Sequence, residues 1–541
     1  MAGSISIAAG VGVLGSFALT TEAPAAGTKP FSHGVASGDP LPGAVVLWTR
    51  VTPTPFAVAG SGKGEPATVQ WEVATDEDFR HIVRSGLLRT DARRDHTIKV
   101  DATGLEPATT YFYRFSFGTE RSPTGRTRTA PAHDSDPERL RFGVVSCANW
   151  QAGYFSSYRH LAERGDLDAV IHLGDYLYEY QPGKYSYGHV NQDIRTHFPP
   201  REIVSLRDYR ERHAQYKTDP DLRALHEAVP FIVTWDDHEV CDGNWAHGAF
   251  EHQPLTEGSF EKRKRAAHQA YDEWMPVRIS GTAVSGDGER MYRRLQFGRL
   301  ADLSMLDLRS YRSKRAEPEE PEIDDPARTI AGTAQLDWLT DNLSTTSAQW
   351  KLIGNPVMIA PVLMPPRPAA EEYALSQNVS VTPTKASASN TDEWDGYTAD
   401  RRRVLEHLVT EEIGNVVFLT GDVHTAWAND VPAGQSGPSV ATEFVVNSIT
   451  SNNTDDFMGT KPRTASLALE ALIQAENPHV RFVNLDDHGY SVLNVTPDGV
   501  QMDWHAISDR RDPEARSRLL TSWSVASGTS YVAPVHGASP A

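Results

Sequence analysis

The sequence predicts an α/β protein in which a small all-β domain precedes a larger domain of alternating strands and helices. Three observations support this prediction. Between residues 30 and 130, apolar and polar side chains alternate, and clusters of Gly, Pro and Asp separate the short runs. From residue 140 onward, short apolar runs alternate with segments of helical period. The 541 residues include 12 Trp, 18 Tyr and 18 Phe, enough for a large core, which excludes global disorder.

The first of these segments, 30–130, is expected to form a β-sandwich. Val69, Trp71 and Val73 show the alternation of a half-buried strand. The run LEPATTYFY at 105–113 is similar to the tyrosine corner of fibronectin-type sandwiches. Because the segment has few candidate catalytic side chains, we interpret it as a scaffold or docking domain. A polar linker with prolines follows at 130–137.

The larger domain is expected over 140–524. Apolar runs predict strands at 142–146, 169–173, 231–234, 416–419 and 443–446. Helical periodicity predicts helices at 154–163, 203–217, 260–274, 334–343 and 398–409. Two stretches, 313–328 and 364–396, are rich in proline and in polar or small residues, and we interpret them as surface insertions. Residues 525–541 are small and polar and are expected to be a loose C-terminal tail.

Residues 1–29 have the pattern of an export signal. No charged side chain occurs in 1–21, residues 4–19 are moderately apolar, and APAA at 23–26 offers small residues of cleavage-site type. Because no Lys or Arg precedes Lys29, we expect the basic region, with twin-arginine as one form, to lie upstream of this start. The alternative is a disordered lead. Gly10, Gly12 and Gly15 fit GxGxxG, but no βαβ unit surrounds them, so a dinucleotide site is rejected.

Composition excludes several classes of function. Lys and Arg number 52 against 71 Asp and Glu, a net charge of −19, which argues against a stable nucleic-acid or anionic-membrane partner. Two cysteines cannot form a disulfide scaffold or a four-thiolate zinc site. The sequence has no GxSxG nucleophile elbow and no P-loop, so serine hydrolases and NTPases lack support.

Metal-capable side chains follow four of the predicted strands. They are Cys147 and Asn149 after the first, His172, Asp175 and Tyr178 after the second, Asp236, Asp237 and His238 after the third, and Asp422 and His424 after the fourth. Any one alone is more often a turn or a hydrogen-bonded structural residue. Ligands in open α/β sheets gather beyond the carboxyl ends of strands, so the coincidence of all four predicts one site.

The residue types suggest a centre with more than one cation. Asp175 could bridge two cations, with Asp237 and Asp422 as hard oxygen ligands suited to calcium or manganese. Tyr178 as phenolate and Cys147 as thiolate would suit a highly charged iron. A tight turn after Gly421 could bring both Asp422 and His424 inward. Paired cations are used in phosphoryl transfer, where they polarise the phosphoryl oxygens, generate hydroxide from water and stabilise the leaving oxygen.

Seven motifs spread over most of the chain resemble the PhoD-like alkaline phosphatases of the metallophosphatase superfamily. They are FSHGVASGD at 31–39, VLWTR at 46–50, GDY at 174–176, WDDHE at 235–239, LDLRSYR at 306–312, QLDWL at 335–339 and GDVH at 421–424. The resemblance implies a fibronectin- or Ig-like sandwich followed by a metallophosphatase-type αββα sandwich with a mixed sheet. It also implies an exported enzyme that hydrolyses phosphomonoesters, and in some members phosphodiesters.

The same resemblance implies a role for each site residue. Ferric iron would be held by Cys147, Asp175, Tyr178 and His424, and adjacent Ca²⁺ by Asp175, Asp237 and Asp422. His238 would contact the phosphate and act in catalysis with Asp175. Asp237 stands where many superfamily members have Asn, and Asp236 and Asn244 remain alternative ligands. Cys241 has no role in the pattern and is interpreted as a structural thiol, while Arg309 and Arg312 are expected to form salt bridges rather than a phosphate clamp.

The predicted function is that of a secreted, metal-dependent alkaline phosphatase. A metal-activated oxygen nucleophile would attack the phosphorus directly, without a phosphoenzyme. The substrate would be a small phosphate ester and the protein a monomer. Two alternatives stay open: a phosphodiesterase acting on cell-wall or lipid phosphodiesters with the same site, and a secreted surface-binding module whose larger domain is inactive.

Overall fold

The structure is a computed structural model that describes residues 29–279, 290–316, 321–364, 387–388, 390–434 and 437–539. The predicted export signal therefore lies outside the described residues, except for Lys29, and so does most of the predicted insertion 364–396. Among the described residues, no helix is both long enough and apolar enough to span a bilayer.

The N-terminal strands form a sandwich of two sheet faces around a buried apolar core. One face contains β1 (Val35–Leu41), β2 (Ala44–Arg50) and β5 (Thr97–Thr103); the other contains β3 (Ala67–Ala74), β4 (Ile82–Thr90), β6 (Thr110–Phe117), β7 (Glu120–Arg121) and β8 (Gly125–Arg128). A short 3-10 turn, η1 (Ala92–Arg94), precedes β5. The Tyr111 hydroxyl accepts a hydrogen bond from the Glu106 N–H at 2.9 Å, so the expected tyrosine corner is present.

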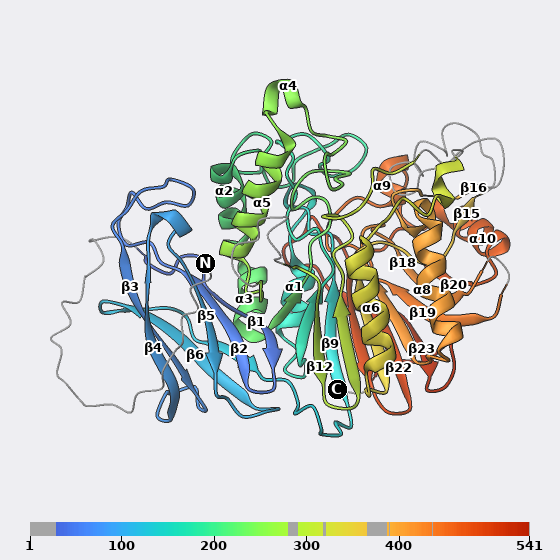
Figure 1. The fold of residues 1–541 in the computed structure, drawn as a ribbon. Helices are drawn as coiled ribbons and strands as arrows, with labels where there is room; N and C mark the ends of the chain where they lie inside the picture. Colours follow the sequence, from blue (N-terminus) through green and yellow to red (C-terminus); the bar gives the residue numbers. More distant parts are fainter. Residues whose placement is uncertain are drawn as a thin grey trace.

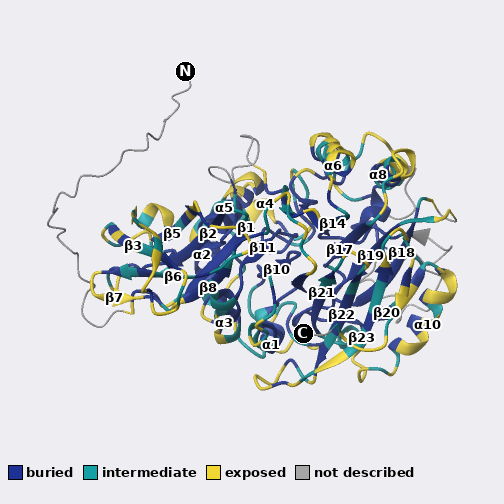
Figure 2. Cartoon of the chain, turned by 90° about the horizontal axis from the view of Figure 1, so that it is seen from below, coloured by how far each residue is buried: buried dark blue, intermediate teal, exposed yellow. Residues whose placement is uncertain are grey.

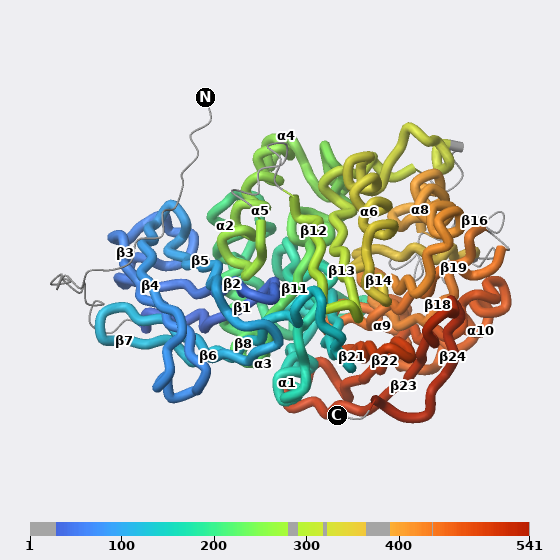
Figure 3. The backbone as a smooth tube through the Cα atoms, turned by 60° about the horizontal axis from the view of Figure 1, so that its bottom comes forward, coloured from blue at the N-terminus to red at the C-terminus, as the bar shows by residue number. Residues whose placement is uncertain are grey.

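The N-terminal sandwich shares a sheet with the larger domain. Strand β1 pairs in parallel with β11 (Phe231–Val233), which makes β1, β2 and β5 one end of a ten-stranded sheet. Gly38 lies at this junction, where a Cβ atom would collide with the carbonyl oxygens of Pro276 and Phe231. In Figure 3 the first strands lie beside β11, and β22 to β24 lie at the opposite end of the molecule.

The larger domain contains two mixed sheets. The rest of the ten-stranded sheet is β9 (Leu140–Val145), β10 (Ala169–His172), β21 (Gly489–Val495), β22 (Gly499–Ile507), β23 (Ser517–Ala526) and β24 (Val532–Pro534). The seven-stranded sheet is β12 (Arg293–Phe297), β13 (Ala301–Met305), β14 (Trp350–Asn355), β17 (Val416–Thr420), β18 (Ala426–Pro432), β19 (Ser439–Val445) and β20 (Val480–Asn484). A small ribbon pairs β15 (Leu363–Met364) with β16 (Ser387–Ala388).

Helices cover the outer face of each sheet (Figure 1). The ten-stranded sheet packs on α1 (Ser156–Ala162), α2 (Leu206–Tyr216), α3 (Pro220–Ala228) and α5 (Phe260–Trp274), and the seven-stranded sheet on α6 (Thr333–Thr345) and α8 (Thr398–Thr410). Among the described residues, the remaining helical segments are α4 (Pro254–Glu257), α9 (Thr454–Met458), α10 (Ser466–Glu476), η2 (Trp150–Ala152), η3 (Pro321–Asp324) and η4 (Trp394–Gly396). Each set of helices buries an apolar core against its own sheet. Another apolar core lies between the two sheets, so the larger domain has the expected αββα layers.

The helices begin where local chemistry favours it. Ser205 and Asp208 form a capping box at the start of α2. Asp219 accepts backbone hydrogen bonds at the start of α3, and Pro220 occupies the first turn, where its missing N–H costs nothing. The outer faces of α6 and α8 are exposed, while the strands behind them are buried (Figure 2).

Two sequence expectations about peripheral segments are wrong. The tail after residue 525 is not loose throughout, because Val532–Pro534 forms β24 on the edge of β23, and the Val532 N–H donates to Asp430 Oδ1 at 2.8 Å. The end of the expected surface insertion 364–396 is buried rather than exposed, since Trp394 lies in the core under α8. Composition gave the wrong prediction in both cases, because a few side chains and backbone groups are enough to hold each segment against the rest of the protein.

Candidate metal centre

Parallel strands from both sheets end at one edge of the core. Strands β9, β10 and β11 run in parallel in one sheet, and β17 and β19 run in parallel in the other. The predicted ligands follow these strands, and we call them the strand-end cluster: Cys147, Asp175, Tyr178, Asp236, Asp237, His238, Asp422 and His424. Their common position follows from the rule that ligand sites in such sheets lie beyond the carboxyl ends of strands.

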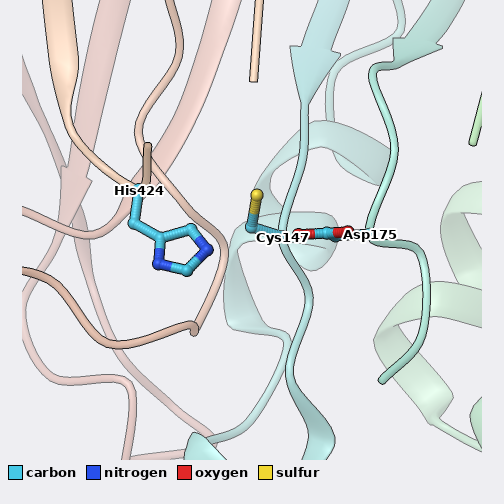
Figure 4. Close-up of side chains that lie close together, drawn as sticks. All are labelled: Cys147, Asp175 and His424. Carbon is cyan, nitrogen blue, oxygen red and sulfur yellow. The ribbon is translucent and has the colours of Figure 1, made fainter. Parts of the chain in front are cut away.

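The cluster contains three groups of side chains whose ligand atoms lie within 4.8 Å of one another. The groups are Cys147 with Asp175 and His424, then Asp175 with Asp237 and His238, and finally Asp175 with Asp236, Asp237 and Asp422. Asp175 belongs to all three. Figure 4 shows the first group, with His424 arriving from the C-terminal half of the chain and facing Cys147 and Asp175.

Four members of the cluster have left-handed backbone conformations. The φ angles are 60° at Cys147, 56° at Asp175, 62° at Asp422 and 59° at His424. Non-glycine residues pay about 1–3 kcal/mol for such a conformation, which persists where the surrounding structure imposes it, often at functional sites. In the turn after Gly421, two such residues follow the end of the strand, and Asp422 and His424 both contribute to the groups described above.

Hydrogen bonds from a neighbouring segment orient Tyr178 and His424. The His424 Nδ1 lies 2.7 Å from the carbonyl oxygen of Asn452, which can only accept, so Nδ1 carries the proton and the Nε2 lone pair faces the cluster. The Tyr178 hydroxyl lies 3.3 Å from that Nε2 and donates to Asp175 Oδ2 at 2.9 Å. Ser451 Oγ donates to the same hydroxyl at 2.6 Å.

A buried glutamate holds His238. The Glu179 side chain is fully buried, and its Oε2 lies 2.8 Å from His238 Nδ1. Nδ1 is thereby fixed as the donor, and Nε2 is directed to the other side, 3.9 Å from Asp237 Oδ1. Although burial opposes it, Asp237 and Glu179 raise the pKa of His238 well above its ordinary value.

Two further side chains organise the aspartates. Glu239 accepts hydrogen bonds from the backbone N–H groups of Asp175, Tyr176 and Asp236 and so ties the turn after β10 to the turn after β11. The Arg309 guanidinium makes a two-pronged contact with Asp236 and lies 3.3 Å from Asp422.

Asp392 anchors the arginines in turn, with one oxygen 2.5 Å from Arg309 and the other 2.8 Å from Arg312. Both arginines form the salt bridges that were expected of them. The described cations that pair with the aspartates of the cluster are Arg309 and His238.

Several buried polar atoms in the cluster have no partner, and they suit a cation. Asp175 Oδ1, Asp237 Oδ1 and both polar side-chain atoms of Asn244 are buried without a hydrogen bond, a costly arrangement for carboxylates in a protein interior. Burial, together with other carboxylates, raises the pKa of Asp175 well above its ordinary value. Four aspartates crowd against two cationic side chains, so the residues present fit hard, multiply charged cations with oxygen ligands.

The thiol and imidazole fit the same interpretation. Burial, followed by the nearby Asp175 carboxylate, raises the pKa of Cys147 well above that of a free thiol. A cation would reverse this effect, because a coordinating thiol is deprotonated outright. Burial lowers the pKa of His424 to about 4, so the ring is the neutral imidazole that metals require. Cys241 lies in an apolar core apart from the cluster, as expected for a structural thiol.

The sequence patterns predicted every side chain of the three groups but not the residues that hold them. Those residues are Glu179, Glu239, Asp392, Ser451 and Asn452. Ser451 and Asn452 had a signal, because a polar run follows the apolar strand at 443–446 just as it does after the other four strands. Glu179 and Asp392 had none, since an isolated acidic residue is most often solvated.

Comparisons with known proteins agree with this architecture. The sequence model of the family described as "PhoD-like phosphatase" matches residues 142–504, and that of its N-terminal domain matches residues 18–131. The chain belongs to the PhoD-like phosphatase family. The Bacillus subtilis (strain 168) protein named alkaline phosphatase D is 39% identical over 503 residues, covering 91% of this chain and 80% of that protein.

A solved structure of PhoD confirms the fold class predicted for this PhoD-like phosphatase. It superposes with a TM-score of 0.84 and 36% sequence identity, covering 96% of this chain and 94% of that one. The β-rich N-terminal region followed by a mixed α/β domain is therefore a shared architecture.

Proposed function

We propose that this PhoD-like phosphatase is a metal-dependent phosphoester hydrolase whose reaction takes place at the strand-end cluster. The observation that carries the proposal is that side chains from distant parts of the chain converge on Asp175 in three groups of candidate ligands. The chain that holds them belongs to a family of phosphatases. Phosphomonoesters are the proposed substrates, as the name of the relative alkaline phosphatase D suggests.

We assign ligands to two kinds of cation. Ferric iron suits Cys147, Asp175, Tyr178 and His424, because thiolate and phenolate stabilise a high charge. Calcium suits the carboxylates of Asp175, Asp237 and Asp422, and Asn244, whose buried side chain has no hydrogen-bond partner, remains an alternative ligand. Asp236 is less available, since Arg309 occupies both of its oxygens. When bound, such cations supply Lewis-acid polarisation and lower the pKa of water.

The side chains of the chain itself have separate tasks in this proposal. His238, held at Nδ1 by Glu179, presents Nε2 toward the transferred phosphoryl group and offsets the charge that develops on it. Arg309 offsets the mutual repulsion of Asp236 and Asp422 by pairing with both. No serine or other covalent nucleophile is assigned, so we expect inversion of configuration at a chiral phosphate; retention would contradict direct attack.

Phosphate release from a monoester and from a bis-ester tests the proposed function. Asp422→Ala should lower kcat/KM for the monoester at least about 100-fold, since the variant removes a ligand. An inactive binding module would instead show no release in the wild type and no change in the variant. A bis-ester preference would favour the phosphodiesterase alternative, which uses the same residues.

The metal assignment has its own test. Elemental analysis of protein purified without chelator should find iron and calcium. A visible charge-transfer band is expected from Tyr178 and Cys147, and Tyr178→Phe should weaken it. Tyr209→Phe is the control, because that buried tyrosine bonds to the carbonyl oxygen of Val240 and has no place in the cluster. A colourless, iron-free and active protein would remove the iron assignment but leave the hydrolase.

A further inference from the structure

One segment that lies outside the strand-end cluster supplies hydrogen bonds that orient two of its members, Tyr178 and His424. Residues 450–452 follow β19, and they present Ser451 Oγ to the Tyr178 hydroxyl and the Asn452 carbonyl oxygen to His424 Nδ1. The backbone N–H groups of Thr450 and Ser451 also donate to the carbonyl oxygen of Cys147, at 3.3 Å each. Segment 450–452 therefore touches three of the proposed iron ligands without being a ligand itself.

This segment has no regular secondary structure of its own. Its position therefore depends on side chains that reach it from elsewhere. Asn452 is almost fully buried, and its Oδ1 accepts from the Gly188 N–H at 3.0 Å while its Nδ2 donates to the Ser186 carbonyl oxygen at 2.6 Å. These bonds connect segment 450–452 to the loop that carries Tyr185, whose ring packs against Tyr178.

A buried guanidinium holds segment 450–452 from the far side, beside His488, whose Nε2 lies 2.8 Å from the Ser451 carbonyl oxygen. Arg510 is 4% exposed; its Nη1 donates to the Thr450 carbonyl oxygen at 2.5 Å and its Nη2 to Asn452 Oδ1 at 2.9 Å. The same Nη2 lies 2.7 Å from Asp456 Oδ1, so a carboxylate fixes the charge in place. The guanidinium also lies over the ring of Tyr187, 4.7 Å from its centroid.

We propose that Arg510 is a positioning residue of the metal centre, acting through segment 450–452 on His424 and Tyr178. The inference rests on the proposed function. The fork geometry of arginine is essential to it, because one group must reach a carbonyl oxygen, an amide oxygen and a carboxylate at once. Without these bonds Asn452 keeps its side-chain contacts with Gly188 and Ser186 but loses the anchor at its amide oxygen. The backbone carbonyl that fixes the tautomer of His424 is then held less firmly.

The chain offers a matched control in the next residue. Arg511 is 52% exposed and pairs with Asp509 at 2.8 Å; it also lies near Tyr187, with its guanidinium 5.2 Å from the ring centroid. No described contact joins its side chain to segment 450–452. Arg511→Gln therefore removes an equal charge from the same surface region without disturbing the positioning contacts.

The experiment compares metal release and kinetics in Arg510→Gln, Arg510→Lys, Arg511→Gln and the wild-type holoenzyme. Metal loss to a chelator is followed by elemental analysis, and kcat and KM are measured with a phosphomonoester. In Arg510→Gln we expect about 10-fold faster metal loss and about a 10-fold lower kcat, with KM changed less than about threefold. Arg510→Lys should fall between this variant and the wild type, because it keeps the charge beside Asp456 but lacks the fork.

Metal loss and kcat in Arg510→Gln equal to those of Arg511→Gln would overturn the proposal. If Arg510→Gln does not fold, Arg510→Lys decides the question in the same way. Metal loss is measured independently of turnover, so a wild-type protein that releases no phosphate would refute the proposed function while the chelator comparison still tests the role of Arg510.

Discussion

Glu179 illustrates how one residue outside the strand-end cluster can fix the orientation of another within it. Its carboxylate is fully buried, receives the Asp242 N–H at 2.7 Å and fixes Nδ1 of His238. Although burial opposes it, His238 keeps the pKa of Glu179 below its ordinary value, so the pair is a carboxylate and an imidazolium. The orientation of His238 is therefore built into the protein before substrate binds.

Glu179→Gln tests this orientation at the residue scale. The amide has the same shape but no charge, so His238 loses its ionic partner and its preference for the cationic form. We expect kcat/KM for a phosphomonoester to fall about 10- to 100-fold, the usual effect of removing such a partner. Glu163→Gln, at an exposed side chain 64% accessible, is the control and should leave kcat/KM unchanged. Equal activity in both variants would show that Glu179 does not act through His238.

At the scale of secondary-structure elements, the strand ends are joined by buried side chains rather than by the sheets alone. Glu239 accepts from the backbone N–H of Asp175 at 3.1 Å, of Tyr176 at 2.6 Å and of Asp236 at 2.9 Å. A carboxylate can accept several bonds, whereas an amide directs two N–H groups at donors. The turns after β10 and β11 thus depend on one residue for their relative position.

Glu239→Gln should lower the free energy of unfolding by about 1–3 kcal/mol, because it leaves buried donors without an acceptor. Chemical denaturation measures the effect. Glu251→Gln removes an ion pair with Lys184 in which both side chains are more than a third exposed, and it should cost less than about 1 kcal/mol. A similar small cost for both variants would contradict the role given to Glu239.

The C-terminal strand gives a second test at this scale. Strand β24 adds to the edge of β23, and Val532 is 3% exposed there. Deletion of residues 530–541 should lower the melting temperature by a few degrees, as a loss of about 1–3 kcal/mol of apolar burial does in a large domain. The kcat should not change, since β24 lies at the end of the sheet farthest from β5 and outside the strand-end cluster. An unchanged melting temperature would show that the strand is dispensable.

At the scale of the whole molecule, the core buries histidines that cannot easily take a proton. His172 is fully buried, its Nε2 lies 3.0 Å from the Tyr158 hydroxyl, and its Nδ1 has no partner. Burial lowers the pKa of His172 to about 3. In the unfolded chain the pKa is about 6.5, so protons bind the unfolded state first as the pH falls. The stability that depends on neutral His172 is therefore full above pH 6.5 and is lost progressively toward pH 3.

His172→Gln should therefore flatten the dependence of stability on pH between about 6.5 and 3, where this one group can cost up to roughly 5 kcal/mol. Thermal unfolding across this range measures the slope for wild type and variant. His247→Gln is the control, because that side chain is 85% exposed. Parallel slopes for all three proteins would show that His172 does not contribute to acid lability.

The sequence by itself predicted the order of five strands and five helices of the larger domain and named the side chains that converge in the three groups. Periodicity located the five predicted strands and five helices within a few residues, because each buries one face or both. The coincidence of polar side chains after four strands predicted the cluster, because the carboxyl ends of parallel strands share an edge. Export, the domain bounds and the monomeric state stay predictions.

Only the tertiary structure decided how the ligands are held. The continuation of the N-terminal strands into the ten-stranded sheet depends on the pairing of β1 with β11, which joins residues nearly two hundred positions apart in sequence. Long-range contacts of Glu179, Asp392 and Arg510 likewise join distant segments. The left-handed conformations of Asp422 and His424 are also imposed by the surrounding structure. Such contacts leave no periodic trace in the chain, because their energy comes from burial and hydrogen bonds that exist only after the sheets have packed.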